Sequence, residues 1–171
     1  LRKINENLER MANIDTLTGL SNRRHMNDHL SALVFDYGKS GKTFTLAIGD
    51  VDFFKKVNDT YGHEVGDYVL ATLARMFEEH MKGKGHVSRW GGEEFFFFFP
   101  DGNGDQVFLY IEHLRLEIEK YNFKFNDEEF KCTMTFGVSE YNQKDSSDEL
   151  VQSVDRKLYT GKERGRNRVI W

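Results

Sequence analysis

Apolar residues recur along this chain at two periods, and the alternation of those periods divides the sequence into helices and strands. Apolar positions three and four residues apart predict amphipathic helices, and short continuous apolar runs predict buried strands. Helices are expected at residues 22–35, 64–81, 105–121 and 147–162. Strands are expected at residues 43–48, 86–90, 95–99, 130–138 and 169–171, with a loop at 37–42.

A pair of glycines, Gly91-Gly92, separates two of the strand-like runs. It predicts a hairpin, because tight turns between strands often need positive φ. From residue 43 onward the expected order is strand, helix, strand, strand, helix, strand, helix, strand. A central hairpin with helices around it predicts an α+β fold, in which a mostly antiparallel central sheet is surrounded by helices.

The first residues carry a separate apolar stripe with alternating spacings of three and four. Its members are Leu1, Ile4, Leu8 and Met11. The spacing fits a helix that packs on its own domain, and it equally fits the end of a parallel coiled coil arriving from an upstream domain. We therefore expect residues 1–13 to end an upstream signalling helix and residues 14–171 to form the main domain.

The whole chain has the length and balance of an ordinary single domain. It contains 171 residues, of which 39% are hydrophobic and 30% are charged, so it can bury a full core without disulfides or a structural metal. The formal net charge of -4 argues against general nucleic-acid binding, which normally needs a basic surface. It leaves open a small anionic ligand held by a few local cations.

The single cysteine, Cys132, excludes an internal disulfide and fits a reducing, cytoplasmic compartment. No apolar run approaches the roughly 18 residues that a membrane helix needs. The chain opens with Leu1-Arg2-Lys3, so we expect the natural start to lie upstream, together with any sensor or membrane-anchoring segment of the full-length protein.

Two aspartates follow the first strand, in the run Asp50-Val51-Asp52. Side chains alternate along a strand, so both carboxylates point to one side if the strand continues that far. Carboxylates at the end of a sheet suit Mg²⁺, which takes a few hard oxygens from the protein and the rest from phosphates and water. The alternative is a solvated acidic turn without a metal.

Two glutamates, Glu93 and Glu94, follow the paired glycines, whose small size leaves room for a bulky ligand. If the hairpin lies beside the first strand, Glu93 reaches Asp50, and converging carboxylates are costly without a cation. Such a cluster suits metal-assisted phosphoryl or nucleotidyl transfer. A surface hairpin with two exposed glutamates fits the same spacing.

The chain ends in a basic segment, residues 162–168, that includes Lys162 and Arg166. Cations at the end of a helix complement its dipole, so a solvated helix terminus accounts for them. They can equally bind phosphates.

Taken together, these motifs resemble the GGDEF domains of bacterial diguanylate cyclases over residues 15–171. The segments that carry the resemblance are Asp15-Thr16-Leu17-Thr18-Gly19-Leu20-Ser21-Asn22-Arg23-Arg24, Asp50-Val51-Asp52-Phe53-Phe54-Lys55-Lys56-Val57-Asn58-Asp59 with Tyr61-Gly62-His63, Arg89-Trp90-Gly91-Gly92-Glu93-Glu94-Phe95, and Gly165-Arg166-Asn167-Arg168. They stand in the order typical of the family, and the third is the signature turn in its Glu-Glu version.

The resemblance implies a palm-like nucleotide cyclase fold and an enzyme that condenses two GTP into cyclic di-GMP and two pyrophosphates. The 3′-hydroxyl of one GTP would attack the α-phosphorus of the other. Each subunit would bind one GTP, so turnover needs a homodimer, and an upstream sensor domain is expected in the full-length protein. A non-catalytic GGDEF module that binds GTP or cyclic di-GMP for signalling is the alternative.

The same resemblance assigns catalytic roles residue by residue. Asp50 and Glu93 would bind Mg²⁺, or Mn²⁺ in its place, through their carboxylates and Val51 through its carbonyl, with two ions per GTP. Glu93 would also accept the proton of the 3′-hydroxyl, assisted by Glu94. Lys55 would neutralise charge that grows on the phosphates.

The remaining assignments concern GTP. The phosphates would be held by the amides of Phe53 and Phe54 and by the side chains of Lys162 and Arg166. Guanine would be read by Asn58 and Asp67, near His63. Asp67 can accept hydrogen bonds from N1–H and the exocyclic amine of guanine, a donor pair that adenine lacks.

Two features depart from the family pattern. Many members carry an Arg-x-x-Asp product-inhibition site shortly before the signature turn, where this chain has Lys82 and Gly85. We therefore predict weak or no inhibition by product through that site. The run Phe95–Phe99 has no functional explanation, and its alternating faces predict core packing against helices.

Overall fold

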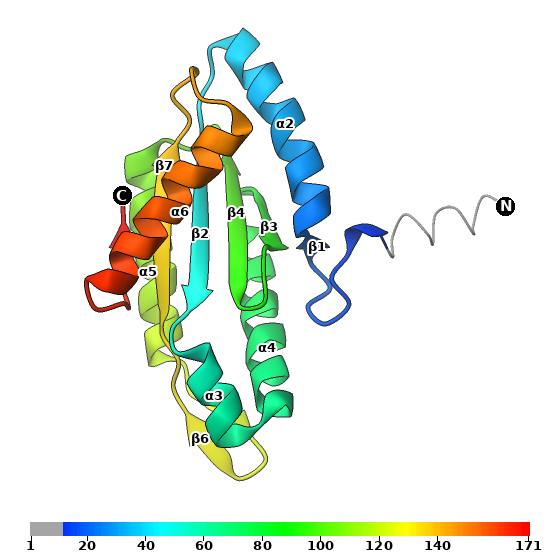
Figure 1. Ribbon diagram of the computed structural model, residues 1–171, viewed down its shortest axis with the longest axis vertical. Coiled ribbons are helices and arrows are strands. Elements are labelled where there is room, and N and C mark those ends of the chain that lie inside the picture. Colours follow the sequence, from blue (N-terminus) through cyan, green and yellow to red (C-terminus); the bar gives the residue numbers. More distant parts are fainter. Residues whose placement is uncertain (1–11) are drawn as a thin grey trace, which may run out of the picture.

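The computed structural model describes residues 12–171, in which helices surround one main sheet (Figure 1). The sheet has the strand order β1-β3-β4-β2-β7-β8. Its strands are β1 (Ser21–Asn22), β2 (Phe44–Val51), β3 (His86–Arg89), β4 (Glu94–Pro100), β7 (Met134–Glu140) and β8 (Val169–Ile170). β2 pairs antiparallel with β4 and β7, and β3 pairs antiparallel with β4. The two short edge strands pair in parallel with their neighbours, β1 with β3 and β8 with β7. The predicted α+β fold with a mostly antiparallel sheet is confirmed.

The helices divide the hydrophobic core into two layers. They are α2 (Arg23–Ser40), α3 (Phe54–Tyr61), α4 (His63–Met81), α5 (Gly104–Lys120) and α6 (Ser147–Glu163). α4 and α5 pack on one face of the sheet, while α2 and α6 pack on the other (Figure 1). The sheet is therefore covered on both faces, which explains why β2 is buried along its whole length.

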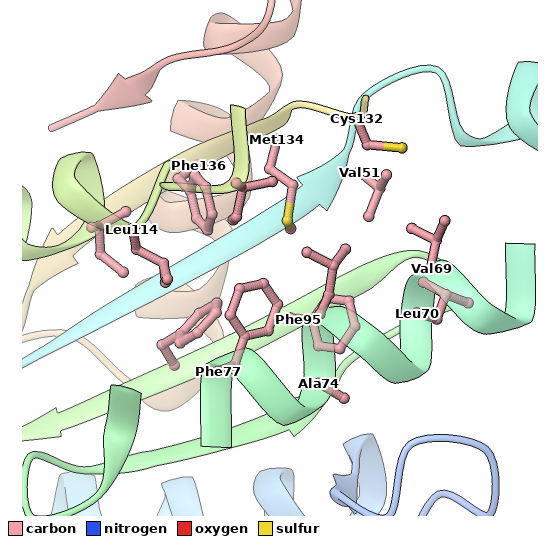
Figure 2. Close-up of a cluster of buried hydrophobic side chains, with 14 of the residues drawn as sticks. Val51, Val69, Leu70, Ala74, Phe77, Phe95, Leu114, Cys132, Met134 and Phe136 are labelled. Atoms are coloured by element: carbon pink, nitrogen blue, oxygen red, sulfur yellow. The ribbon is translucent and has the colours of Figure 1, made fainter. Parts of the chain in front are cut away.

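The phenylalanine run Phe95–Phe99 lies in β4 and serves both layers. Its odd-numbered members pack in the layer of α4 and α5, and its even-numbered members pack in the layer of α2 and α6. None of the five is more than 4% exposed. Figure 2 shows Phe95 close to Phe77 of α4, with ring centroids 4.9 Å apart. The burial of all five rings confirms the prediction of core packing. Each buried ring contributes about 1.5–3 kcal/mol to the stability of the fold.

The first helix is longer than the sequence predicted. α2 continues to Ser40 and ends at Gly41, which has φ 69° and donates its amide to the carbonyl of Tyr37 at 3.1 Å. The loop predicted at 37–42 was therefore mostly wrong. Tyr37 packs edge-on against Phe44, with ring centroids 5.0 Å apart, and this tertiary contact stabilises a last turn whose glycine and serine favour a loop locally.

Four short elements were missing from the prediction, namely β1, α3, β5 and β6, and one predicted strand began too early. α3 has only eight residues, and the hairpin of β5 (Phe123–Phe125) and β6 (Glu128–Phe130) has three-residue strands, so neither gives a clear periodic signal. The strand predicted at 130–138 starts at Met134, because Phe130 pairs with Phe123 in the small hairpin. The segment between them leads from that hairpin into the main sheet.

The predicted upstream helix at residues 1–13 lies almost entirely outside the described residues. Within residues 12–171, none of the helices combines the length and the apolar character that crossing a membrane requires.

Candidate active site

The ends of β2 and β4 bring the predicted carboxylates together. Asp50 is the register partner of Glu94, and the amide of Val51 donates to the carbonyl of Glu93 at 3.2 Å. The hairpin therefore lies directly beside β2, which was the condition for a site shared by Asp50 and Glu93. Val51 ends β2 next to Asp50, so its carbonyl belongs to the same edge of the sheet.

Asp50 is buried and is paired with a cation. Its side chain is 8% exposed, and its Oδ2 lies 2.8 Å from Nζ of Lys162 in α6. Burial raises the pKa of Asp50 to about 6; Lys162 lowers it, and Glu93 and Glu94 add to the rise. Burial likewise raises the pKa of Glu94, and the neighbouring carboxylates of Asp155 and Glu93 contribute to that rise. Negative charge is thus concentrated where β2 meets the hairpin.

The donor set at this edge consists of oxygens. Within the described part of the chain, no three side chains of His, Cys, Asp or Glu are already gathered to hold a metal ion. Asp50, Glu93 and the Val51 carbonyl together offer hard oxygen ligands, which fit Mg²⁺ or Mn²⁺ better than a softer metal. An ion that keeps several waters or takes ligand phosphates needs only such a small protein set.

Asp52 does not join this cluster. β2 stops at Val51, so the alternation of the strand does not extend to Asp52. Its buried carboxylate accepts hydrogen bonds from the hydroxyls of Thr133 at 2.7 Å and Thr135 at 2.6 Å, and from the amide of Asn167 at 3.0 Å. Asp52 therefore holds the loop after α6 against the sheet, and the expectation that it shares a site with Asp50 was wrong.

The two glycines of the turn do not have the backbone conformation that the sequence predicted. Neither Gly91 nor Gly92 has positive φ, so the expectation of positive φ was wrong. A Cβ at Gly91 would lie 2.6 Å from Oε2 of Glu94, whereas a Cβ at Gly92 would meet nothing within 4 Å. Gly91 thus allows Glu94 to fold back over the turn, and Gly92 leaves its outer side open.

Arg89 stabilises this turn by donating hydrogen bonds to its carbonyls, a role that the sequence did not reveal. Its Nη2 donates to the carbonyl of Gly92 at 2.8 Å, and its Nε donates to that of Gly91 at 3.2 Å. Its Nη1 lies 3.0 Å from both carboxylate oxygens of Asp15. Burial raises the pKa of Asp15, but hydrogen bonds from Thr18 and the charge of Arg89 outweigh it and lower the pKa. The opening motif and the signature turn are therefore one connected unit.

α3 presents its N-terminus to the same region. The first amides of a helix have no intrahelical acceptor and carry partial positive charge, and α3 begins at Phe54 without a side-chain cap. Phe53 precedes the helix with φ 55° and is 61% exposed. The guanidinium of Arg166 lies over its ring, 4.5 Å from the centroid. Phe53 and Arg166, both predicted to bind phosphate, are therefore in contact with each other.

A cavity of about 340 Å³ adjoins the turn. The predicted site residues that line it are Phe54, Lys55, Asn58, His63, Asp67 and Glu93. Asp50, Lys162 and Arg166 are not among its lining residues. The structure therefore places the predicted base-reading side chains in one cavity with Phe54 and Lys55, whereas Lys162 and Arg166 lie outside its lining. Glu93 lines this cavity and also joins it to the end of β2, because its carbonyl accepts from the amide of Val51.

Gly66 of α4 is a second residue that sequence reasoning missed. A Cβ at this position would lie 1.9 Å from Oδ1 of Asn58 and 3.1 Å from Cζ of Phe54. The side chain of Asn58 thus packs directly against the backbone of Gly66, and the position of Asn58 in the cavity depends on the absence of a side chain there. A glycine inside a strongly periodic helix is the signal that could have identified it, because such a glycine costs helix stability without a packing reason.

Lys82 and Gly85, which stand at the positions expected for the product-inhibition motif, each have a local contact or packing constraint. Lys82 pairs with Glu79 in the preceding turn. A Cβ at Gly85 would lie 2.0 Å from the backbone carbonyl oxygen of Phe98. Since a carbonyl of a central strand cannot move easily, an aspartate does not fit at residue 85 without a backbone shift. Weak or absent inhibition by product stays a prediction.

Comparison with known proteins gives a family match over nearly the whole chain. The family profile described as "Diguanylate cyclase, GGDEF domain" matches residues 12–168. Diguanylate cyclase DosC of Escherichia coli (strain K12) is 32% identical over 174 residues, which cover 100% of this chain and 38% of that protein. The chain therefore spans less than half the length of this curated relative.

Solved structures show the same arrangement of the chain. The coiled coil and GGDEF domain of DgcB from Caulobacter crescentus, in complex with c-di-GMP, is similar with a TM-score of 0.94 and 31% identity, covering 99% of this chain and 90% of that chain. Diguanylate cyclase SiaD from Pseudomonas aeruginosa, in complex with its activator SiaC, is similar with a TM-score of 0.90 and 32% identity, covering 99% and 65%.

Proposed function

Because the chain belongs to the GGDEF domain family of diguanylate cyclases, we propose that it condenses two GTP into cyclic di-GMP and two pyrophosphates. In each condensation the 3′-oxygen of one GTP bonds to the α-phosphorus of the other. The bond from that phosphorus to the bridging oxygen breaks, pyrophosphate leaves, and the hydroxyl proton is released. The observation that carries the proposal is the buried carboxyl of Asp50 among Glu93 and Glu94, beside a cavity that holds Asp67.

The carboxylates of Asp50 and Glu93 and the carbonyl of Val51 would hold Mg²⁺ or Mn²⁺, with two ions per GTP. When bound, such ions polarise the phosphates and lower the pKa of a nearby hydroxyl. The environment of Asp50 supports this assignment: burial raises its pKa to about 6, Lys162 lowers it, and the charges of Glu93 and Glu94 add to the rise. A bound divalent cation would favour the charged form of Asp50.

Protons and phosphate charge would be handled by the chain's own side chains. Glu93 would accept the proton of the 3′-hydroxyl, and Glu94 would assist; burial raises the pKa of Glu94, which makes it a stronger base than an exposed glutamate. Lys55 lines the cavity and would neutralise charge on the phosphates.

The phosphates themselves would lie at the N-terminus of α3. The helix begins at Phe54 without a side-chain cap, and the amides of a helix N-terminus, together with the positive end of its dipole, favour anions; the amides of Phe53 and Phe54 would bind the phosphate oxygens there. Lys162 and Arg166 would complete the clamp. The approach of Arg166 to Phe53 supports this, since it brings a guanidinium to the start of the helix.

Selection of guanine would rest on Asp67 and Asn58, with His63 near the base. These side chains line one cavity with Glu93, so a base bound there keeps its nucleotide close to the carboxylates. Asp67 is exposed in the free protein, and a base that covers its carboxylate without donating to it would take the charge out of water unpaired, which is strongly unfavourable. Asp67→Asn should therefore weaken GTP binding about tenfold or more.

One copy of this site holds one GTP, so the proposed reaction needs two copies facing each other as a homodimer. An upstream sensor domain would control that encounter in the full-length protein. We propose the dimer as the state that turns over, and the rate of product formation per chain should therefore rise with protein concentration.

The test is incubation of the concentrated protein with GTP and Mg²⁺, followed by chromatography of the nucleotides. Cyclic di-GMP and pyrophosphate are expected, and Glu93→Gln should abolish both. Glu128→Gln, a change at an exposed glutamate of the β5–β6 hairpin, is the matched control and should not. GTP binding without any product would instead favour a non-catalytic signalling module.

A further inference from the structure

Phe53 has a conformation that the stability of the fold does not explain. Its backbone has φ 55° and ψ 32°, and its side chain is 61% exposed. The left-handed region is unfavourable for a residue with a bulky side chain, and it favours Gly or Asn. An exposed aromatic ring in this conformation contributes nothing to the core, and residues held in this way concentrate at functional sites.

The ring of Phe53 contacts the guanidinium of Arg166. The Cζ atom of Arg166 lies 4.5 Å from the ring centroid. The backbone of Arg166 is fixed as well, because its amide donates to the carbonyl of Gly161 at 3.0 Å. The flat guanidinium is attracted to the face of an aromatic ring by the charge distribution of that ring. Backbone and ring together therefore restrict where this charge can lie.

We infer that the side chain of Phe53 is a positioning residue for Arg166, which it holds at the start of α3 ready for a phosphate. The inference rests on the proposed function, because the phosphates of GTP are the ligand that Arg166 would meet. The ring occupies the face of the guanidinium, while phosphate oxygens accept from its N–H edge, so both contacts can exist at once.

The benefit of this contact is entropic. A free arginine side chain has many rotamers, and ordering it during binding lowers affinity. An arginine already held over Phe53 avoids much of that loss. The strained backbone of Phe53 is then explained, since it directs the ring toward Arg166 on the loop that follows α6.

The experiment measures binding of 3′-deoxy-GTP with Mg²⁺ by calorimetry, because this nucleotide lacks the attacking hydroxyl and cannot turn over. Phe53→Leu removes the aromatic ring and keeps apolar bulk, and it should weaken affinity about fivefold. Phe53→Tyr should recover most of that loss. Phe53→Asn should weaken affinity similarly while raising the melting temperature by about 2–4 °C, because asparagine tolerates the left-handed backbone.

A matched control exists on α2. Phe35 is also 61% exposed, and Nζ of Lys39 lies 3.8 Å from its ring centroid. Phe35→Leu removes a similar cation–aromatic contact away from the site and should leave affinity unchanged. In an Arg166→Ala background, Phe53→Leu should cause no further loss, because the two residues then share one effect.

The outcomes separate this inference from the proposed function. If the unmodified protein does not bind 3′-deoxy-GTP at all, the proposed function fails and the inference fails with it. If it binds and Phe53→Leu binds equally well, only the inference is overturned. A loss of turnover in Phe53→Leu with unchanged affinity also overturns it, because the ring would then act elsewhere than on Arg166.

Discussion

The substitution Gly66→Ala tests whether the missing side chain at residue 66 sets the position of Asn58 in the cavity. The new Cβ would lie 1.9 Å from Oδ1 of Asn58, while ordinary contact begins at 3.4 Å. The amide of Asn58 must therefore move by about 1.5 Å, which its flexible side chain can do by rotation. The contact with Phe54 at 3.1 Å requires a shift of only a few tenths of an ångström.

These distances predict different effects on stability and on binding. Alanine is better than glycine inside a helix by about 1 kcal/mol, and this gain offsets most of the local crowding. The free energy of unfolding should therefore change by less than about 1 kcal/mol. Asn58, however, is rotated out of its place in the cavity. The loss of one or two hydrogen bonds to guanine should weaken GTP binding about tenfold.

The assay pairs urea unfolding with the affinity for GTP. Gly38→Ala in α2 is the control for helix propensity, because its Cβ would lie 3.1 Å from the hydroxyl of Tyr141, away from the cavity. The double variant Gly66→Ala with Asn58→Ala should bind GTP no more weakly than Asn58→Ala alone. Unchanged affinity in Gly66→Ala, or a loss of stability above about 3 kcal/mol, would show that Gly66 does not set the position of Asn58 in this way.

Three further predictions follow from single contacts. Asp15→Ala removes the carboxylate that Arg89 holds at 3.0 Å; unfolding by urea should show a loss of about 2 kcal/mol, with slower cyclic di-GMP formation, and an unaltered rate would contradict the link to the turn. Burial raises the pKa of Cys132 to about 12, and Asp52 adds to the rise, so the thiol stays protonated at pH 8. The thiol of Cys132 should react with a disulfide reagent only after the protein unfolds, and rapid labelling of the folded protein would contradict the burial of this thiol. Phe97→Ala empties a fully buried position and should cost about 3–5 kcal/mol in urea unfolding.

The periodic parts of the fold could be predicted because their signal is local. α4 and α5 were predicted to within a residue of their ends, since long amphipathic helices repeat the same pattern over several turns. β4 was predicted from a continuous apolar run. The approach of Glu93 to Asp50 was predicted only on the condition that the hairpin lies beside residues 43–48, and the pairing of β4 with β2 meets that condition.

Other features depended on contacts between residues far apart in the sequence. Asp52 and Asn167 are 115 residues apart, and Asp15 and Arg89 are 74 apart. No local pattern marks either partner, because a lone aspartate has the same sequence signal in a solvated turn as in a buried hydrogen-bond network. The last turn of α2 likewise depends on Tyr37 reaching residues of the sheet.

The family, the α+β class and the residue types of the site follow from motifs and from the period of apolar positions, and these are present in the sequence alone. Three features became visible only in the folded chain: Asp52 supports a loop, Gly91 and Gly66 provide space for Glu94 and Asn58, and Arg166 lies against Phe53. A period shows which face of an element is buried, whereas the role of a polar side chain depends on which partner the fold brings within hydrogen-bonding distance.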